Sequence, residues 1–438
     1  MGKKGKNVAE SSTRKKKNTR EPFSFLGQDI DVADKQTVKS HLFYLILVFI
    51  AATLLVVVVT TVVFHSFVDL FDIGIYLKHT VMLMQGQFPI NPEFPYPPLA
   101  FIPILLAFVP ALLFNSGEAF VFTFQFLMFV CNCVTVVCVY FIGLKIYNEE
   151  RTAFIAALLS ATAFSAIYFV ITKFDAFPTM LLMLAVLFTT YRRTVEGYAA
   201  AMLGFFTKVF PILALPFFVL HNAKSTSLKQ ELIAAAKIVI PIGIVLFLPL
   251  FLINPSTFSI YIPIRSELGY YSNTLTFTLF SWLHNVFDLS VSLDMISAVM
   301  YAAMGLGLLI LLYIAWRVPD KEPKLSIKLL LCAVVLVVVC AKVRSPQYIV
   351  WFTPLICLLA ADSFRKIASF YIFQALAYAE FPLMFSTFYT ALQYTDPALS
   401  QGWWITLMMF TLEYLALFIC LWFVVNPREI AKKVKGAA

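Results

Sequence analysis

The sequence predicts an all-α, polytopic transmembrane protein with about 12 spans. Of its 438 residues, 61% are hydrophobic and 13% are charged, and the mean hydropathy is +0.86. So few charged residues cannot cover a water-soluble globule of this size. Apolar runs recur along the whole chain, and a run of about 20 residues is long enough to cross a bilayer as a helix. We therefore expect a multi-pass protein of the cell membrane.

The first expected span covers residues 41–64 and is too long to be the core of a signal peptide. Before it, residues 1–40 carry the basic runs MGKKGKNVAE and STRKKKNTR without apolar periodicity. This composition predicts a disordered cytoplasmic tail held near anionic lipids. Nucleic-acid binding is the alternative for such a tail, and we expect no nucleic-acid partner. Residues 41–425 form the expected transmembrane domain, and residues 426–438 a basic cytoplasmic C-terminus.

Positive charge orders the spans, because Lys and Arg favour the cytoplasmic side. One threading puts 27 of the 33 Lys and Arg residues inside, with both termini cytoplasmic. It makes residues 65–118 a first outer loop. Residues 98–114 then form an apolar helix on the outer leaflet, because a span there would put Lys145 and Arg151 outside. The remaining predicted segments are spans at 119–144, 152–171, 177–191 and 232–252, two short halves at 198–207 and 209–220, an outer loop at 253–291, and five later spans.

Six cations remain on the outer side in this threading. Four of them lie at span ends, where the phosphate of a lipid-linked donor would sit. Snorkelling of long side chains at helix ends is the alternative explanation. The predicted donor-phosphate ligands are Lys208, Arg344, Lys342, Arg265 and Lys173, and Lys78 is the sixth cation.

Acidic residues lie on the same outer side. Residues 67–86 have apolar positions at steps of three and four, which predicts an amphipathic helix along the membrane surface. Asp69, Asp72 and Tyr76 share one face of that helix. Helix capping by the aspartates is the alternative. Five prolines between 89 and 98 predict a stiff connection, and Asp175 in TKFDAFP emerges at the same boundary.

A carboxylate beside lipid-level cations suits the transfer of a sugar from a lipid-linked phosphate to a hydroxyl. The carboxylate takes the hydroxyl proton, and the cations offset charge on the departing phosphate. The sequence has no Gly-rich phosphate loop and no H-x-x-x-H or H-E-x-x-H spacing. All seven cysteines fall in apolar spans, where disulfides and zinc sites are unusual. We therefore expect no metal and no cofactor.

Five segments occur in an order that is informative as a whole. They are D-I-G-I-Y at 72–76, Q-G-Q-F-P at 85–89, F-P-Y-P-P-L at 94–99, F-F-T-K-V-F-P-I-L-A-L-P at 205–216 and R-S-P-Q-Y-I-V-W-F-T-P-L at 344–355. This order resembles the GT-C superfamily of glycosyltransferases, polytopic enzymes that use polyprenyl-phosphate sugars. It is most similar to the mycobacterial-type phosphatidylinositol-mannoside (alpha-1,2) mannosyltransferase group. A weaker likeness links it to the first mannosyltransferase of GPI-anchor synthesis.

The resemblance implies that Asp72 is the catalytic base of a hexosyltransferase, with Asp69 as the supporting or alternative acid. It implies an inverting transfer, with mannose as the default sugar, from a polyprenyl-phosphate donor to a lipid-linked or glycolipid acceptor at an extracytoplasmic active site. One departure is that the first acid of the GPI enzymes' D-x-D would fall on Leu70, which weakens the case for a metal. The candidate substrate-binding residues are Tyr76, Asp175, Tyr96, Gln347 and Tyr348.

Other assignments compete with this one. A transporter or lipid flippase predicts ionisable residues near the bilayer midplane and paired inverted repeats with broken helices. The sequence instead places its acids and bases at one outer boundary and has no repeated halves. A purely structural membrane subunit gives no reason for acids and bases to share one boundary. Glu380 and Glu413 fall within the last two spans and either line a lipid cavity or pair with Tyr and Trp neighbours. Gln347, Tyr348 and Trp351 either hold substrate or belong to an interfacial aromatic belt.

Overall fold

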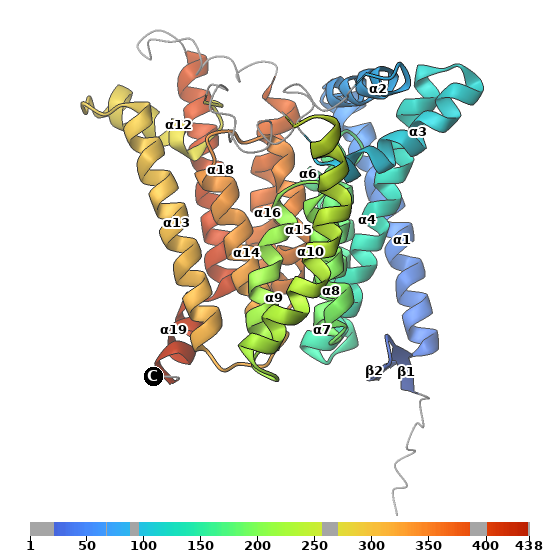
Figure 1. Cartoon of the computed structure of the whole chain (residues 1–438). Helices are drawn as coiled ribbons and strands as arrows, with labels where there is room; N and C mark the ends of the chain where they lie inside the picture. The colour runs from blue at the N-terminus through green and yellow to red at the C-terminus, as the bar shows by residue number, and fades with distance from the viewer. Residues whose placement is uncertain (1–21, 67, 88–95, 256–269, 386–400, 437–438) are drawn as a thin grey trace, which may run out of the picture.

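The computed structural model describes residues 22–66, 68–87, 96–255, 270–385 and 401–436. Its long helices run side by side as one bundle, and both ends of the described chain lie at the lower end of that bundle in Figure 1. At the opposite end lie two helices, α2 (Phe71–Met84) and α3 (Phe101–Phe114). The bundle thus separates the end that holds the termini from the end that holds the acidic stretch.

The chain begins with a β-hairpin of β1 (Pro22–Phe25) and β2 (Gln28–Asp34). Leu26 and Gly27 form its two-residue turn with positive φ at both positions, as primed hairpin turns require. The Phe25 ring stacks on Phe141 at a centroid distance of 3.8 Å. The prediction of a disordered tail over residues 1–40 is therefore wrong for residues 22–40, because this short aromatic strand pairs and docks. Residues 1–21 lie outside the described part.

Helix α1 spans Lys35–Val58, so the first apolar helix begins six residues before the predicted start. The Asp34 side chain caps its N-terminus by accepting a hydrogen bond from the Thr37 amide. The other long helices of the bundle are α4 (Gly117–Tyr147), α7 (Ala176–Thr190), α10 (Leu228–Ile253), α13 (Leu293–Arg317), α14 (Pro323–Cys340), α16 (Phe364–Tyr378) and α18 (Gln401–Val425).

Shorter helices fill the remaining positions. They are α5 (Glu150–Ala161), α6 (Phe164–Val170), α8 (Thr194–Phe205), α9 (Ala214–Asn222), α12 (Leu275–Phe280), α15 (Ile349–Ala360) and α19 (Pro427–Gly436). The segment 253–291, predicted as an outer loop, contains the helix α12. The Thr274 side chain caps this helix by accepting a hydrogen bond from the Phe277 amide. The pair α5 and α6, which covers the predicted span 152–171, is bent by 55° at Thr162 and Ala163.

Six helices of the described chain are long and apolar enough to cross a membrane, and up to seven if the bent pair α5 and α6 is one span. Four further apolar helices have 10–17 residues, including the segment Pro98–Phe114. The chain is thus a multi-pass membrane protein. Each predicted span or half that the described residues cover has a helix at its place, and the count of 12 crossings stays a prediction.

Helix α2 is shorter than the helix predicted over residues 67–86. Its buried face carries Ile73, Tyr76 and Thr80, whereas Leu70 and Met84 of the predicted apolar stripe are exposed. Apolar periodicity marks the buried face poorly here, since lipid chains are as apolar as a protein core. Helix α3 follows a 3-10 turn at Pro98–Ala100, and most of the five-proline connection lies outside the described residues.

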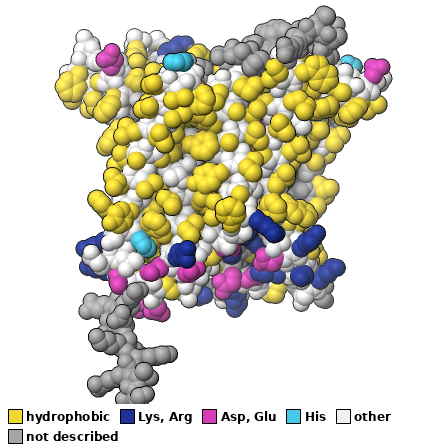
Figure 2. Space-filling view, turned by 180° about the vertical axis from the view of Figure 1, so that it is seen from behind, with side chains coloured by type: hydrophobic (Ala, Val, Ile, Leu, Met, Phe, Trp, Pro, Cys, Tyr) yellow, Lys and Arg dark blue, Asp and Glu magenta, His cyan; other side chains and the backbone are white. Residues whose placement is uncertain are grey.

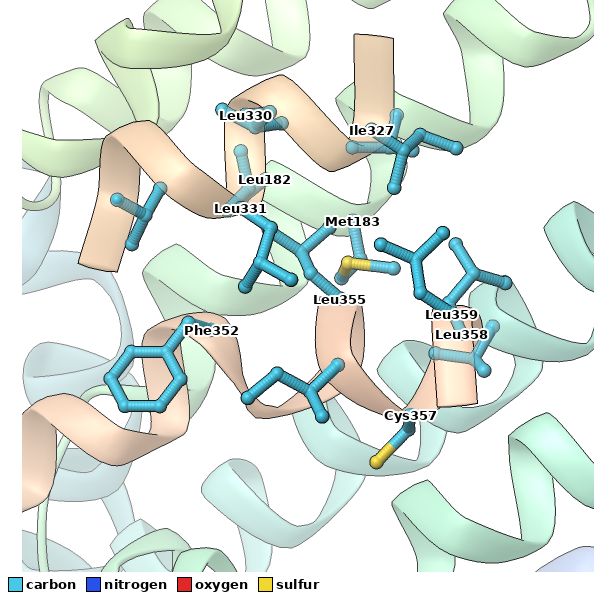
Figure 3. Close-up of a cluster of buried hydrophobic side chains, with 14 of the residues drawn as sticks. Leu182, Met183, Ile327, Leu330, Leu331, Phe352, Leu355, Cys357, Leu358 and Leu359 are labelled. Atoms are coloured by element: carbon cyan, nitrogen blue, oxygen red, sulfur yellow. The ribbon is translucent and has the colours of Figure 1, made fainter. Parts of the chain in front are cut away.

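The largest hydrophobic core extends through most of the bundle and includes the region where α7, α14 and α15 meet. Figure 3 shows aliphatic side chains and the Phe352 ring packed together there, among them Leu182 of α7, Leu331 of α14 and Phe352 of α15. Each of these side chains is buried. The turn that precedes α7 and residues 345–348, which precede α15, continue directly into these helices, so the core fixes these two segments relative to each other.

Charged side chains gather at the lower end of the bundle, as the dark blue and magenta atoms in Figure 2 show. Hydrophobic side chains cover the height between the two ends. Helix α19 is held at the lower end by ion pairs from Lys328 to Glu429 at 2.8 Å and from Lys433 to Asp320 at 2.5 Å. The predicted C-terminal segment is therefore a docked basic helix.

Candidate functional site

Two aspartates and one lysine form the centre of the site at the start of α2. The Lys173 ammonium lies 2.6 Å from Asp69 Oδ2 and 3.1 Å from Asp72 Oδ2. Lys173 is buried, and the Asp72 side chain keeps 21% of its surface exposed. The turn between α6 and α7 supplies the lysine, and its placement opposite α2 brings together residues that are a hundred positions apart.

The two aspartates differ in how their oxygens are used. Asp69 lies just before α2: its Oδ1 accepts from the Phe71 amide at 3.0 Å, and its own amide donates to the Tyr168 hydroxyl at 3.1 Å. Asp69 therefore performs the capping that was the alternative explanation for these acids. Asp72 lies in the first turn of α2, and its Oδ1 has no hydrogen-bond partner among the described residues. Asp72 thus has a carboxylate oxygen available to a substrate.

A second ion pair lies deeper, between Lys208 and Asp175. The two atoms Nζ and Oδ1 are 2.6 Å apart, and the Asp175 side chain is fully buried. The Trp351 indole also donates to Asp175 Oδ1. Four aromatic rings surround the ammonium at 5.0–5.5 Å, those of Tyr96, Phe174, Tyr348 and Trp351. Such rings stabilise a cation by their quadrupoles.

Contacts link the two ion pairs into one site. Gln347 Nε2 points to Asp72 Oδ2 at 3.5 Å, the long limit of a hydrogen bond. The Tyr348 ring stacks on Trp351 with centroids 4.0 Å apart. Tyr76 packs its ring edge to face against Tyr96 and Phe174.

Burial above all, and then nearby acidic groups, raise the pKa of the Tyr76 hydroxyl well above its ordinary value, so this group stays neutral.

Arg344 lies in a different cluster. Its guanidinium pairs with Glu413 and with Glu380 Oε2 at 3.4 Å, and it donates to the Asn273 carbonyl at 3.1 Å. All three charged side chains are buried. A phosphate here would meet two carboxylates, so these surroundings disfavour the predicted phosphate contact. The prediction that Glu380 and Glu413 line a lipid cavity or pair with Tyr and Trp missed this arginine.

The other predicted site residues are placed as follows. Lys342 lies 5.1 Å from the centre of the Tyr270 ring. Arg265 lies outside the described residues. No group of three or more His, Cys, Asp or Glu that could hold a metal occurs in the described part of the chain. Asp69, Asp72, Lys173, Asp175, Lys208, Tyr76, Tyr96, Gln347 and Tyr348 are the predicted residues that the structure brings together.

The sequence family decides what kind of protein carries this site. Residues 94–341, more than half of the chain, match the model of glycosyltransferase family 87. The chain belongs to glycosyltransferase family 87. Because the chain is also a multi-pass membrane protein, it is a membrane glycosyltransferase, and the transporter, flippase and structural-subunit alternatives are disfavoured.

The chain is also similar to several solved structures. The family 87 chain aligns with ArnT from Cupriavidus metallidurans bound to undecaprenyl phosphate at 14% identity and a TM-score of 0.46, over 88% of this chain and 77% of ArnT. It also aligns with the oligosaccharyltransferase AglB from Archaeoglobus fulgidus in complex with an inhibitory peptide and a dolichol-phosphate, at 14% identity and a TM-score of 0.40. That alignment covers 90% of this chain and 56% of AglB. No curated protein sequence matches the chain. The family assignment therefore rests on the match over residues 94–341.

Sequence reasoning missed two features in and near the candidate site. The first is the aromatic cage of Lys208, whose rings come from three separate segments. The second is the pairing of Arg344 with Glu380 and Glu413. A signal for the second was present, because a carboxylate within an apolar span almost always pairs with another polar group.

Proposed function

We propose that this membrane glycosyltransferase moves a sugar from a polyprenyl-phosphate donor to a hydroxyl of a lipid-linked or glycolipid acceptor, as GT-C enzymes do. Mannose is the proposed sugar, from the resemblance to the phosphatidylinositol-mannoside group. The observation that carries the proposal is the partly exposed Asp72 carboxylate beside the buried Lys173 in a family 87 chain. A base and a cation side by side suit attack by a hydroxyl with departure of a phosphate.

The proposed step is one displacement. The acceptor oxygen forms a bond to the anomeric carbon while the bond from that carbon to the phosphate oxygen breaks. Asp72 accepts the hydroxyl proton, and the bond electrons leave with the polyprenyl phosphate. A single displacement inverts the anomeric configuration. Asp69 is paired with Lys173 and capped to α2, so its proposed role is to hold the lysine beside Asp72.

The cations have different proposed roles. Lys173 offsets charge on the departing phosphate. It differs from Arg344 in that its two carboxylate partners, Asp69 and Asp72, are 17% and 21% exposed, so a ligand can reach this ion pair. Lys342 is a second proposed phosphate contact. Lys208 is neutralised by Asp175, and its proposed role is to fix the aromatic rings that face the substrate, Tyr96 and Tyr348.

Sugar transfer by the purified protein tests the proposal. We expect a polyprenyl-phosphate mannose to be consumed in the presence of a glycolipid extract, with one new glycolipid formed and its anomeric configuration opposite to that of the donor. Nuclear magnetic resonance of the product gives the configuration. A nucleotide sugar offered alone is the matched control and should give no product. A product that keeps the donor configuration would contradict the single displacement.

The side of the membrane gives a second prediction, with the active site on the extracytoplasmic face and both termini cytoplasmic. Helix α4 connects the two sides, with exposed Glu118 near one end and exposed Arg151 just beyond the other. In cells, a membrane-impermeant maleimide should label Glu118→Cys and leave Arg151→Cys unlabelled. Permeabilised cells are the control and should give labelling of both. Labelling of Arg151→Cys in intact cells would reverse the assignment.

A further inference from the structure

Arg344 connects four segments at the upper end of the bundle. Its guanidinium contacts Glu380 in the π-helical turn after α16 (Ala379–Leu383) and Glu413 of α18, together with the carbonyl of Asn273 before α12. The Tyr414 hydroxyl donates to the same Asn273 carbonyl at 2.7 Å. Arg344 itself belongs to the connection between α14 and α15. This connection is therefore tied to three neighbouring segments by one side chain.

Burial makes this tie rigid. The side chains of Glu380 and Glu413 are 2% and 1% exposed, so water does not replace the arginine as their partner. A guanidinium that donates to two carboxylates has a fixed orientation because its donors lie in one plane. Removing the arginine from this position would leave buried charges without a counter-ion, which is strongly unfavourable. The contacts of Arg344 thus restrict the position of the connection between α14 and α15.

The same connection reaches the proposed base three residues later. Ser345 accepts from the Tyr348 amide at 3.0 Å, and Pro346 restricts the backbone between them, which makes residues 345–348 a tight turn. Within this turn Gln347 points to Asp72 Oδ2 at 3.5 Å. Hydrogen bonds of catalytic groups are often this long before substrate binds. The backbone that carries Gln347 is therefore anchored on one side by Arg344 and on the other by buried helix α15.

We propose that Glu380 and Glu413 are positioning residues for the transfer reaction: by clamping Arg344 they fix the turn 345–348 and aim the Gln347 amide at Asp72. The proposal rests on the proposed function, in which Asp72 is the base. A donor on one carboxylate oxygen turns the other oxygen toward the acceptor hydroxyl. The competing role is purely structural, the joining of α16 to α18 without any effect on the site.

A double-mutant cycle separates the two roles. Glu413→Gln keeps the size of the side chain, and Arg344 retains Glu380 as its counter-ion. We expect kcat to fall by up to about 10²-fold, as for a misplaced reacting group, with KM for donor and acceptor unchanged. Gln347→Leu should lower kcat to a similar extent, and the double variant should be no slower than either single one. Glu380→Gln is the second variant for the same cycle, should Glu413→Gln fail to fold.

The matched control is Glu231→Gln, another buried carboxylate, which accepts from Tyr198 at 2.8 Å at the beginning of α10. This variant should leave kcat unchanged, both in the parent protein and in the Gln347→Leu protein. A Glu413→Gln effect that is undiminished in the Gln347→Leu background would overturn the positioning role, as would a normal kcat in both Glu413→Gln and Glu380→Gln.

A measurement without turnover distinguishes this proposal from the proposed function. A cysteine placed at half-buried Ser345 should react with a maleimide faster in the Glu413→Gln protein than in the parent or the Glu231→Gln protein. Equal labelling rates in all three would refute the clamp whatever the activities are. Faster labelling together with full turnover of Asp72→Asn would support the clamp and refute the assignment of Asp72 as base.

Discussion

Replacing Asp72 by Asn is expected to lower the turnover of sugar transfer by ~10²–10⁴-fold, the usual contribution of a positioned general base. Asparagine has nearly the same shape and can still meet Lys173 and Gln347 through its carbonyl oxygen, but it cannot accept the proton of the acceptor hydroxyl. KM for the polyprenyl-phosphate donor should stay close to that of the parent. Steady-state rates with a fixed acceptor extract, measured over a range of donor concentrations, provide both quantities.

The matched control is Asp69→Asn, since both aspartates contact the same ammonium at 2.6 and 3.1 Å. Asp69 caps α2 and holds Lys173, so this change should lower turnover much less than Asp72→Asn. Loss of turnover in Asp69→Asn with near-normal turnover in Asp72→Asn would move the base to the earlier residue. Near-normal turnover in both variants would rule out a carboxylate base at the start of α2.

Most helices could be predicted from the sequence because apolar length and positive charge act locally. Helix α4 covers the predicted span 119–144, and Pro323–Cys340 lies where a late span was expected. The hairpin at Pro22–Asp34 could not be found in this way. Its stability depends on the stacking of Phe25 on Phe141, more than a hundred residues away, and no local pattern contains such a contact.

Sequence reasoning named many of the residues that the structure brings together in the candidate site, but not how they pair. Lys173 and Lys208 stood out because they lie on the outer side of the predicted threading, whereas Lys and Arg usually favour the cytoplasmic side. Both lie in the candidate site. Charge topology could not identify the partners of these lysines. A lysine at the end of a span can pair either with an acidic residue of the protein or with the phosphate of a ligand, and the sequence does not distinguish the two. Arg344 is the clearest case: its two glutamates lie 36 and 69 residues further along the chain, on separate helices.

Lys208→Met is expected to destabilise the protein by ~3–5 kcal/mol, the cost of removing one partner of a buried ion pair. The change leaves the fully buried Asp175 carboxylate without its counter-ion. Asp175 Oδ2 already lacks a hydrogen-bond partner among the described residues, so only the Trp351 indole would remain to stabilise the charge. Asp175→Asn should cost less, because four aromatic rings continue to stabilise the Lys208 ammonium.

Unfolding in mixed micelles, with circular dichroism followed as sodium dodecyl sulfate is added, measures these free energies. The double variant Lys208→Met/Asp175→Asn should recover much of the loss, since it removes both charges and keeps an acceptor for the Trp351 indole. Lys366→Met is the matched control: its pair with Asp362 is partly exposed, and such pairs contribute ~0–1 kcal/mol. If Lys208→Met unfolds like this control and only loses affinity for the donor, Lys208 serves the donor phosphate, as its position at a span end predicted, and the ion pair with Asp175 contributes little to the fold.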